Sequence, residues 1–161
     1  MLAVSLAIKS IISFKAISDR IASLKVKVSG GILNLLSVYS PHDGYTFDAR
    51  HHFYSDLSAN TRKHHAHETT LVFGDFNTQL GYAGCDESNF LGPYMYQKLF
   101  HEKNNVLSNR SLFSEYCGTH AFVVAHTLFD YTDDFLVTYH NLLSHAMEEL
   151  CHQNFHNLIM C

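Results

Sequence analysis

Four side chains of the kinds that act on phosphate groups stand in two short runs of this sequence. Tyr39 and His42 lie three positions apart, and Asp75 and Asn77 lie two positions apart in the run Gly-Asp-Phe-Asn. A carboxylate can orient or deprotonate a water molecule, while the neutral groups can donate hydrogen bonds to phosphate oxygens. These residue types therefore suggest a site that holds a phosphate and directs a water at it.

A strand–helix–strand unit is expected to bring the two runs together. Ile32–Tyr39, which is apolar on both faces, and the β-branched run Thr69–Phe73 predict two strands. Between them, Phe47–Ala59 predicts a helix with Thr46 or Asp48 as its N-cap. A crossover of this length through a helix makes the strands parallel, so their carboxyl ends open on the same edge of the sheet.

The run from Gly74 to Asn77 has two interpretations. In an extended chain, Asp75 and Asn77 point the same way and meet Tyr39 and His42 at the sheet edge. Gly74 would then let the backbone approach a ligand or a neighbouring strand closely. Gly-Asp-x-Asn is also a good turn sequence that needs no chemistry. The sequence leaves both interpretations open.

Other segments frame this unit. Ala22–Val28 alternates apolar and polar residues, as a half-buried strand does, and Ser29-Gly30-Gly31 predicts a hairpin turn into the next strand. The remaining predicted elements are a short helix or strand end over Ile8–Phe14, a short helix over Ser111–Tyr116 with Asn109 as its N-cap and Gly118 past its end, a strand over Phe122–Ala125, and an amphipathic helix over Asn141–Ile159.

The composition fits one globular domain. Of the 161 residues, 47% are hydrophobic and 16% are charged, so the chain can bury a core. A net charge of −4 argues against a nucleic-acid binder that relies on surface charge alone, but not against an enzyme that meets nucleic acid through metal ions. No stretch approaches the ~20 apolar residues of a membrane helix. Four cysteines without a C-x-x-C pair predict reduced, mostly buried thiols. We expect an intracellular protein, nuclear or cytoplasmic.

Thirteen histidines are the unusual feature of the composition. His64, His65 and His67 form a tract that could bind a transition metal or could be a solvated loop. A second set at helical spacing could hold Zn²⁺ or form a polar exposed face: His145, Glu149, His152 and His156.

Several separate motifs give the sequence a resemblance to a known family. Val72–Gly81, which contains Gly-Asp-Phe-Asn, resembles the signature of the endonuclease/exonuclease/phosphatase superfamily. Within it, the run looks like the endonuclease domain of LINE-type (non-LTR) retrotransposons and of craniofacial-development-protein-like sequences. Ile17–Ile21, Val38–Gly44 and the motifs between Asn109 and Phe129 are similar to that subgroup's in order and spacing. Several motifs in the right order are far harder to obtain by chance than one, and the resemblance covers about three-quarters of the chain.

The resemblance implies an α/β (α+β) fold, part of a four-layer α/β sandwich, and a Mg²⁺- or Mn²⁺-dependent hydrolase of DNA phosphodiesters. It implies that Asp75 orients or deprotonates the attacking water and touches the metal only indirectly. Asn77 and Tyr39 would act at the scissile phosphate. His42 would contact the substrate where many members of the superfamily have an Asn. The metal would neutralise the phosphate and stabilise the leaving oxygen.

The chain departs from the family pattern at both ends. The family's first metal-binding Asn and its Glu have no counterpart, since the first acidic residue is Asp19, and Ser144-His145 lacks the Asp of the closing Ser-Asp-His motif. We therefore expect residues 1–129 to form a truncated endonuclease-type domain, inactive as it stands and prone to aggregate, with residues 130–161 as an unassigned tail. The alternative functions are a non-catalytic interaction module and a His-rich metal-binding protein.

Overall fold

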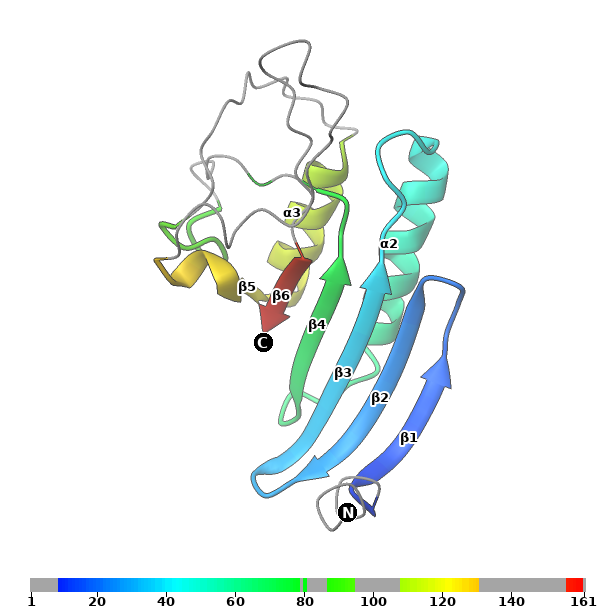
Figure 1. Cartoon of the computed structure of the whole chain (residues 1–161), viewed down its shortest axis with the longest axis vertical. Coiled ribbons are helices and arrows are strands. Elements are labelled where there is room, and N and C mark those ends of the chain that lie inside the picture. Colours follow the sequence, from blue (N-terminus) through cyan, green and yellow to red (C-terminus); the bar gives the residue numbers. More distant parts are fainter. Residues whose placement is uncertain (1–8, 79, 81–86, 95–107, 131–155, 161) are drawn as a thin grey trace, which may run out of the picture.

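The computed structural model describes residues 9–78, 80, 87–94, 108–130 and 156–160, and Figure 1 draws the others as a thin grey trace. Its elements are β1 (Ile11–Ala16), β2 (Ile21–Val28), β3 (Gly31–Tyr39), α2 (Phe47–Thr61), β4 (Thr69–Asp75), α3 (Asn109–His120), β5 (Val123–Val124), the 3₁₀ helix η1 (Ala125–Leu128) and β6 (His156–Met160). The strands form one sheet in the order β1-β2-β3-β4-β6-β5, and α2 and α3 lie on one side of it (Figure 1). Neither of these helices is long and apolar enough to cross a bilayer.

The first three strands form an antiparallel meander. The predicted hairpin is confirmed, because β2 and β3 pair from Ile21 opposite Val38 to Val28 opposite Gly31. Gly31 has a φ of 139°, a conformation that glycine adopts readily and that lets the chain reverse here. β1 pairs antiparallel with β2, so the stretch that could have been a short helix or a strand end is a strand from Ile11 onward.

The predicted crossover is also confirmed. α2 leads from β3 into β4, and the two strands are parallel, with Leu33 opposite Thr69 and Tyr39 opposite Asp75. Of the two candidate N-caps, Thr46 caps α2, and its hydroxyl oxygen accepts a hydrogen bond from the amide of Ala49. That bond satisfies one of the free amides at the start of the helix.

The C-terminal segment contains a strand where the sequence predicts a helix. Most of the helix predicted over Asn141–Ile159 lies outside the described residues, but its last four positions belong to strand β6. β6 pairs antiparallel with β4, from Leu71 opposite Met160 to Asp75 opposite His156. An unpaired edge of β4 offers a ladder of hydrogen bonds to an apolar segment, which local helical spacing does not take into account. The strand predicted over Phe122–Ala125 is shortened to β5, and η1 follows it.

α3 is longer than predicted at both ends. Its N-cap is Ser108, whose hydroxyl accepts from the amide of Ser111, so the assignment of Asn109 as the cap is wrong. Gly118 lies inside the helix, and Ala121 ends it with a left-handed φ of 52°. Serine caps as well as asparagine does, and the side chain of Asn109 is used elsewhere.

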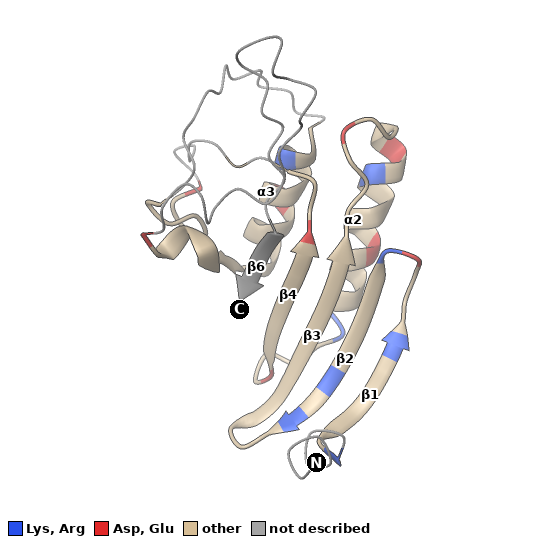
Figure 2. Ribbon diagram, viewed as in Figure 1, with Lys and Arg blue, Asp and Glu red and all other residues tan. Residues whose placement is uncertain are grey.

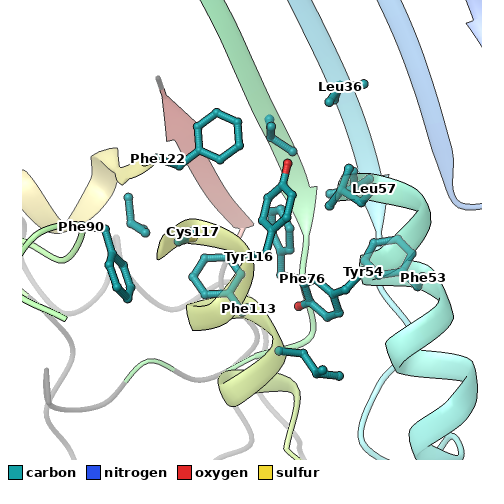
Figure 3. Packing of buried hydrophobic residues seen from close by; sticks show 14 of the residues in the cluster. Leu36, Phe53, Tyr54, Leu57, Phe76, Phe90, Phe113, Tyr116, Cys117 and Phe122 are labelled. Carbon is teal, nitrogen blue, oxygen red and sulfur yellow. The ribbon is translucent and has the colours of Figure 1, made fainter. Parts of the chain in front are cut away.

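The core lies between the two helices and the face of the sheet that they cover (Figure 3). Its largest buried side chains include Leu36, Phe53, Tyr54, Leu57, Val72, Phe76, Phe113, Tyr116 and Phe122. Cys117 is a buried free thiol, as predicted, and burial raises its pKa; the other three cysteines lie outside the described residues. The described residues thus form two layers, one sheet and one layer of helices, of the four that the family resemblance implies.

Candidate functional site

The carboxyl ends of β3 and β4 meet at one edge of the sheet, as the crossover predicts. Tyr39 and Asp75 are register partners on adjacent parallel strands, so their side chains leave the same face of the sheet. The amide of Ser40, the next residue along, donates to the carbonyl oxygen of Asp75 at 2.8 Å. Tyr39 is 56% exposed, whereas Asp75 is partly buried. A phenol accessible to a ligand therefore stands beside a carboxylate.

Gly74 explains how closely the two strands approach. It has a φ of 139°, and a Cβ built on it would lie 1.9 Å from the carbonyl oxygen of Val38. No side chain fits at that distance, so only glycine lets β4 lie against β3 at this point. Of the two roles that the sequence left open for Gly74, the structure supports close approach to a neighbouring strand.

Asn77 is placed differently from the extended-chain expectation, which is wrong at this residue. Its backbone is left-handed, with a φ of 47°, because Asp75 Oδ1 accepts a hydrogen bond from the Asn77 amide at 2.8 Å and closes a turn. The side chain of Asn77 is buried, and its Nδ2 donates to the carbonyl oxygen of Ser40 at 2.7 Å. Asn77 thus ties the exit of β4 to the exit of β3.

His42 lies on the exposed loop that follows β3. Its Nδ1 accepts a hydrogen bond from the amide of Gly44 at 3.0 Å, and its ring meets the ring of Tyr45 edge to face at 4.7 Å. These contacts fix the ring at the rim of the same sheet edge as Tyr39.

Arg20 is a residue of this edge to which sequence reasoning gave no role. Its guanidinium donates to the carbonyl oxygen of Tyr39 at 3.3 Å and to the hydroxyl of Tyr45 at 3.2 Å. It also lies over both rings, at 5.6 Å and 5.1 Å from their centroids. The available signal was the run Ile17–Ile21, which contains Arg20 and which entered only as part of the family resemblance. Arg20 adds a cation beside two exposed phenols.

Asn109 joins the loop that follows β3 to the loop that follows β4, a role that the sequence did not reveal. It is fully buried, and its Nδ2 donates to the carbonyl oxygens of Pro41 at 2.7 Å and Asn77 at 2.9 Å. Its backbone amide donates to Asp43 Oδ1 at 3.0 Å, and that same oxygen accepts from the buried Arg50 at 2.7 Å. These contacts join the start of α3 to the loops after β3 and β4.

A Mg²⁺ or Mn²⁺ ion, which the family resemblance implies, does not fit the residues gathered here. Mg²⁺ requires a near-octahedral shell of oxygens at short distances. Asp75 is the carboxylate that the strands bring to the edge, and its Oδ1 already closes the turn. Asp43, in the neighbouring loop, bridges Arg50 and the amide of Asn109. Across the described part of the chain, no three side chains of His, Cys, Asp or Glu cluster as a metal site would need.

The histidine tract does not form such a cluster either. Nδ1 of His64 lies 3.1 Å from the hydroxyl of Thr70, while the rings of His65 and His67 stack at 5.5 Å. Partial burial lowers the pKa of His64. Of the second set, His145, Glu149 and His152 lie outside the described residues, and His156 belongs to β6.

No protein-family model and no curated protein sequence matches this chain. Among solved structures, the chain is similar to an endonuclease/exonuclease/phosphatase family protein from Leptotrichia buccalis C-1013-b, with a TM-score of 0.51 and 11% sequence identity. The match covers 87% of this chain and 41% of that one, so this chain spans less than half the length of the solved protein. The similarity is one of fold. The chain has a mixed α/β fold that partly matches a fold of the endonuclease/exonuclease/phosphatase family.

Proposed function

We propose that the chain carries part of a phosphodiester hydrolase of the endonuclease/exonuclease/phosphatase superfamily, of the retroelement DNA endonuclease kind, and that it is inactive as it stands. The observation that carries this proposal is the register of Tyr39 with Asp75 at the common end of β3 and β4, in a fold that partly matches that family. The reaction is the attack of water on a DNA phosphodiester in an intracellular, nuclear or cytoplasmic setting.

Each residue has a defined part in this proposal. The Asp75 carboxylate orients or deprotonates the water, and the exposed hydroxyl of Tyr39 donates to a phosphate oxygen. Asn77 is bonded to Ser40, so it acts by fixing the geometry of the edge and reaches the phosphate only if that bond is exchanged. His42, on the exposed loop, contacts the substrate beside the scissile phosphate.

We infer inactivity from the carboxylates at the edge, to which the described residues contribute Asp75 at the end of β4. A phosphodiesterase of this kind relies on a divalent ion to neutralise the phosphate, and Asp75, whose Oδ1 already closes the turn with the Asn77 amide, offers Mg²⁺ little in exchange for its own waters. We expect no nicking of supercoiled plasmid in Mg²⁺ or Mn²⁺ above a control carrying Asp75→Ala. Metal-dependent cleavage that disappears in Asp75→Ala would show that the chain assembles a working site.

The edge itself is tested by binding. Titration with a short DNA oligonucleotide, followed by amide chemical shifts in NMR spectra, should perturb Tyr39, His42 and Asp75 first. The same titration of Tyr39→Ala should weaken the perturbation, and Ser55→Ala, on the exposed side of α2, should leave it unchanged. Perturbations confined to other parts of the chain would contradict the assignment of this edge to DNA.

A non-catalytic interaction module is the second candidate function. Large exposed apolar side chains on the face of the sheet opposite α2 and α3 favour it, including Phe14 at 66% exposure and Phe73 at 39%. This candidate predicts a binding partner for the sheet and no dependence of that binding on Asp75.

A further inference from the structure

Three rings and one guanidinium gather beside the edge where β3 and β4 end. Arg20 lies over the rings of Tyr39 and Tyr45, and the ring of His42 meets that of Tyr45 edge to face. We call these four residues the aromatic cluster. The turn from β1 to β2, which carries Arg20, lies at the end of the sheet where β3 and β4 finish (Figure 2). The aromatic cluster therefore borders the edge that carries Asp75.

A closed turn holds two of these rings in place. The amide of Tyr45 donates to the carbonyl oxygen of His42 at 3.0 Å, and the amide of Gly44 donates to His42 Nδ1. A Cβ on Gly44 would lie 2.7 Å from the His42 ring, so glycine lets this ring fold back against the turn. Asp43, in the same turn, accepts from the amide of Asn109 at the start of α3. Rings that are fixed in advance lose little entropy when a ligand binds them.

The aromatic cluster keeps surface available to a ligand. Tyr39 is 56% exposed and Tyr45 is 43% exposed. A Tyr ring offers a flat apolar face, and every nucleobase has a flat face that stacks on such a ring. Arg20 bonds the Tyr39 carbonyl oxygen and the Tyr45 hydroxyl, and a guanidinium carries further N–H groups beyond these two. Its side chain is 22% exposed, so it can also donate to a phosphate oxygen.

The charge of this region favours an unpaired strand over a duplex. Arg20 has the exposed carboxylate of Asp19 at 3.9 Å from its Nε, and the chain has a net charge of −4. A duplex hides the faces of its bases and is bound chiefly through its phosphates, which requires a basic surface. A single strand exposes the faces of its bases, so stacking can supply the attraction that charge does not.

We propose that the aromatic cluster binds one unpaired base of a DNA strand, which stacks on Tyr45 while Arg20 donates to the phosphate of the same nucleotide. The inference rests on the proposed function, because it places this nucleotide next to the phosphate assigned to Tyr39 and Asp75. Tyr39 connects the two positions, since Arg20 lies over its ring and Asp75 is its register partner on β4. The cluster therefore favours an open strand over a closed duplex.

The test compares two labelled strands of equal charge by fluorescence anisotropy. One is an oligothymidylate of about eight nucleotides, a length within the site size of stacking proteins, and the other is the same sugar–phosphate chain with abasic sites in place of the bases. The strand with bases should bind roughly 5- to 150-fold tighter, the factor that stacking of one base supplies. A duplex of the same length should bind more weakly than the single strand.

Tyr45→Leu and Tyr94→Leu form a matched pair of variants. Tyr94 is 41% exposed, close to the 43% of Tyr45, and its segment is bonded to η1 rather than to the aromatic cluster. Tyr45→Leu should remove the preference for the strand with bases. Tyr94→Leu and Tyr45→Phe should retain it, because the second keeps the ring and loses only the hydroxyl. Far-UV circular dichroism checks that all three variants fold.

Arg20→Met separates the phosphate contact from stacking. The logarithm of the binding constant of a single strand falls with the logarithm of the salt concentration, with a slope of about −0.7 for each phosphate neutralised. Arg20→Met should therefore make the slope about 0.7 less negative and keep the preference for the strand with bases. Tyr45→Leu should weaken binding without changing the slope.

Failure of both strands to bind, or equal binding of the two, would overturn the inference. A preference that Tyr45→Leu and Tyr94→Leu reduce equally would also overturn it, because the stacking site would then lie elsewhere. These results leave the proposed function standing if DNA still perturbs the amide signals of Tyr39 and Asp75. A preference that depends on Tyr45, without any perturbation at Asp75, would instead refute the proposed function and leave the aromatic cluster as a stacking site.

Discussion

Replacing Asn109 by alanine tests whether one buried amide holds the candidate site together. In the folded chain its Nδ2 donates to the carbonyl oxygens of Pro41 and Asn77, and alanine leaves both oxygens buried without that donor. A buried polar group that loses its partner costs ~1–3 kcal/mol, so two cost ~2–6 kcal/mol. Asn109 Oδ1 is itself buried without a hydrogen-bond partner, and removing it recovers part of this cost. We expect a net loss of about 2–4 kcal/mol in the free energy of unfolding.

Asn60→Ala is the matched control. Its Nδ2 donates to the carbonyl oxygen of Asp56 inside α2, and its Oδ1 accepts from the ammonium of Lys63. The first bond is only partly buried and the second is exposed, so their loss should cost ~1 kcal/mol or less. Urea unfolding followed by far-UV circular dichroism measures both variants, at one protein concentration because self-association would shift the midpoint. In Asn109→Ala, the amide of Ser40, which bonds Asp75 across the two strand exits, should also exchange its hydrogen faster. A cost no larger than that of Asn60→Ala would refute the role of Asn109.

Three further outcomes are expected. Gly74→Ala should cost more than ~3 kcal/mol or prevent folding, because the new Cβ would lie 1.9 Å from the β3 backbone. Gly118→Ala, whose Cβ would lie in open space within α3, should instead stabilise the chain by up to ~1 kcal/mol, and thermal melts compare the two variants. Burial lowers the pKa of His126 to about 4 in the folded chain, so as pH falls from 6.5 to 4 the unfolded chain binds a proton that the folded chain does not. About 3 kcal/mol of stability should be lost over this pH range in the wild type and retained in His126→Gln. The hydrogen bond from Lys25 lowers the pKa of Glu68 to about 2, so a further loss should occur as pH falls from 4.5 toward 2 and should diminish in Lys25→Met; acid titration of the unfolding midpoint measures both.

The backbone of the site could be predicted from the sequence because local rules decide it. The apolar run Ile32–Tyr39, the helix behind the Thr46 cap and the β-branched run from Thr69 fix a parallel crossover, and the crossover fixes which strand ends meet. The close approach of the backbone to a neighbour at Gly74 is also predictable, because a glycine inside a strand pattern often marks such a contact.

The side-chain arrangement of the site could not be predicted, because it depends on partners far away in the chain. The turn that Asp75 makes with the amide of Asn77 is local, but it competes with the extended chain, and sequence alone does not decide between them. Asn109 bonds residues more than thirty positions away, so its spacing resembled only a helix cap. Strand β6 depends likewise on an edge of β4 that is nowhere near it in sequence.

The central claim is that Asp75 belongs to a hydrolytic site and is more than the first residue of a turn. The most direct measurement adds the family's acidic and histidine ligands to the edge, where the described residues contribute Asp75. A family N-terminal segment with its Glu is fused before Met1, the family's Asp-His ending replaces the chain after Phe129, and nicking of supercoiled plasmid in Mg²⁺ is compared for this fusion and its variants. The account predicts that the fusion nicks, that Asp75→Asn lowers the rate about 10²–10⁴-fold, as loss of one general base does, and that Tyr39→Phe lowers it less. A folded Asp75→Asn fusion that nicks as fast as its parent would contradict the account and leave Gly74–Asn77 as a turn.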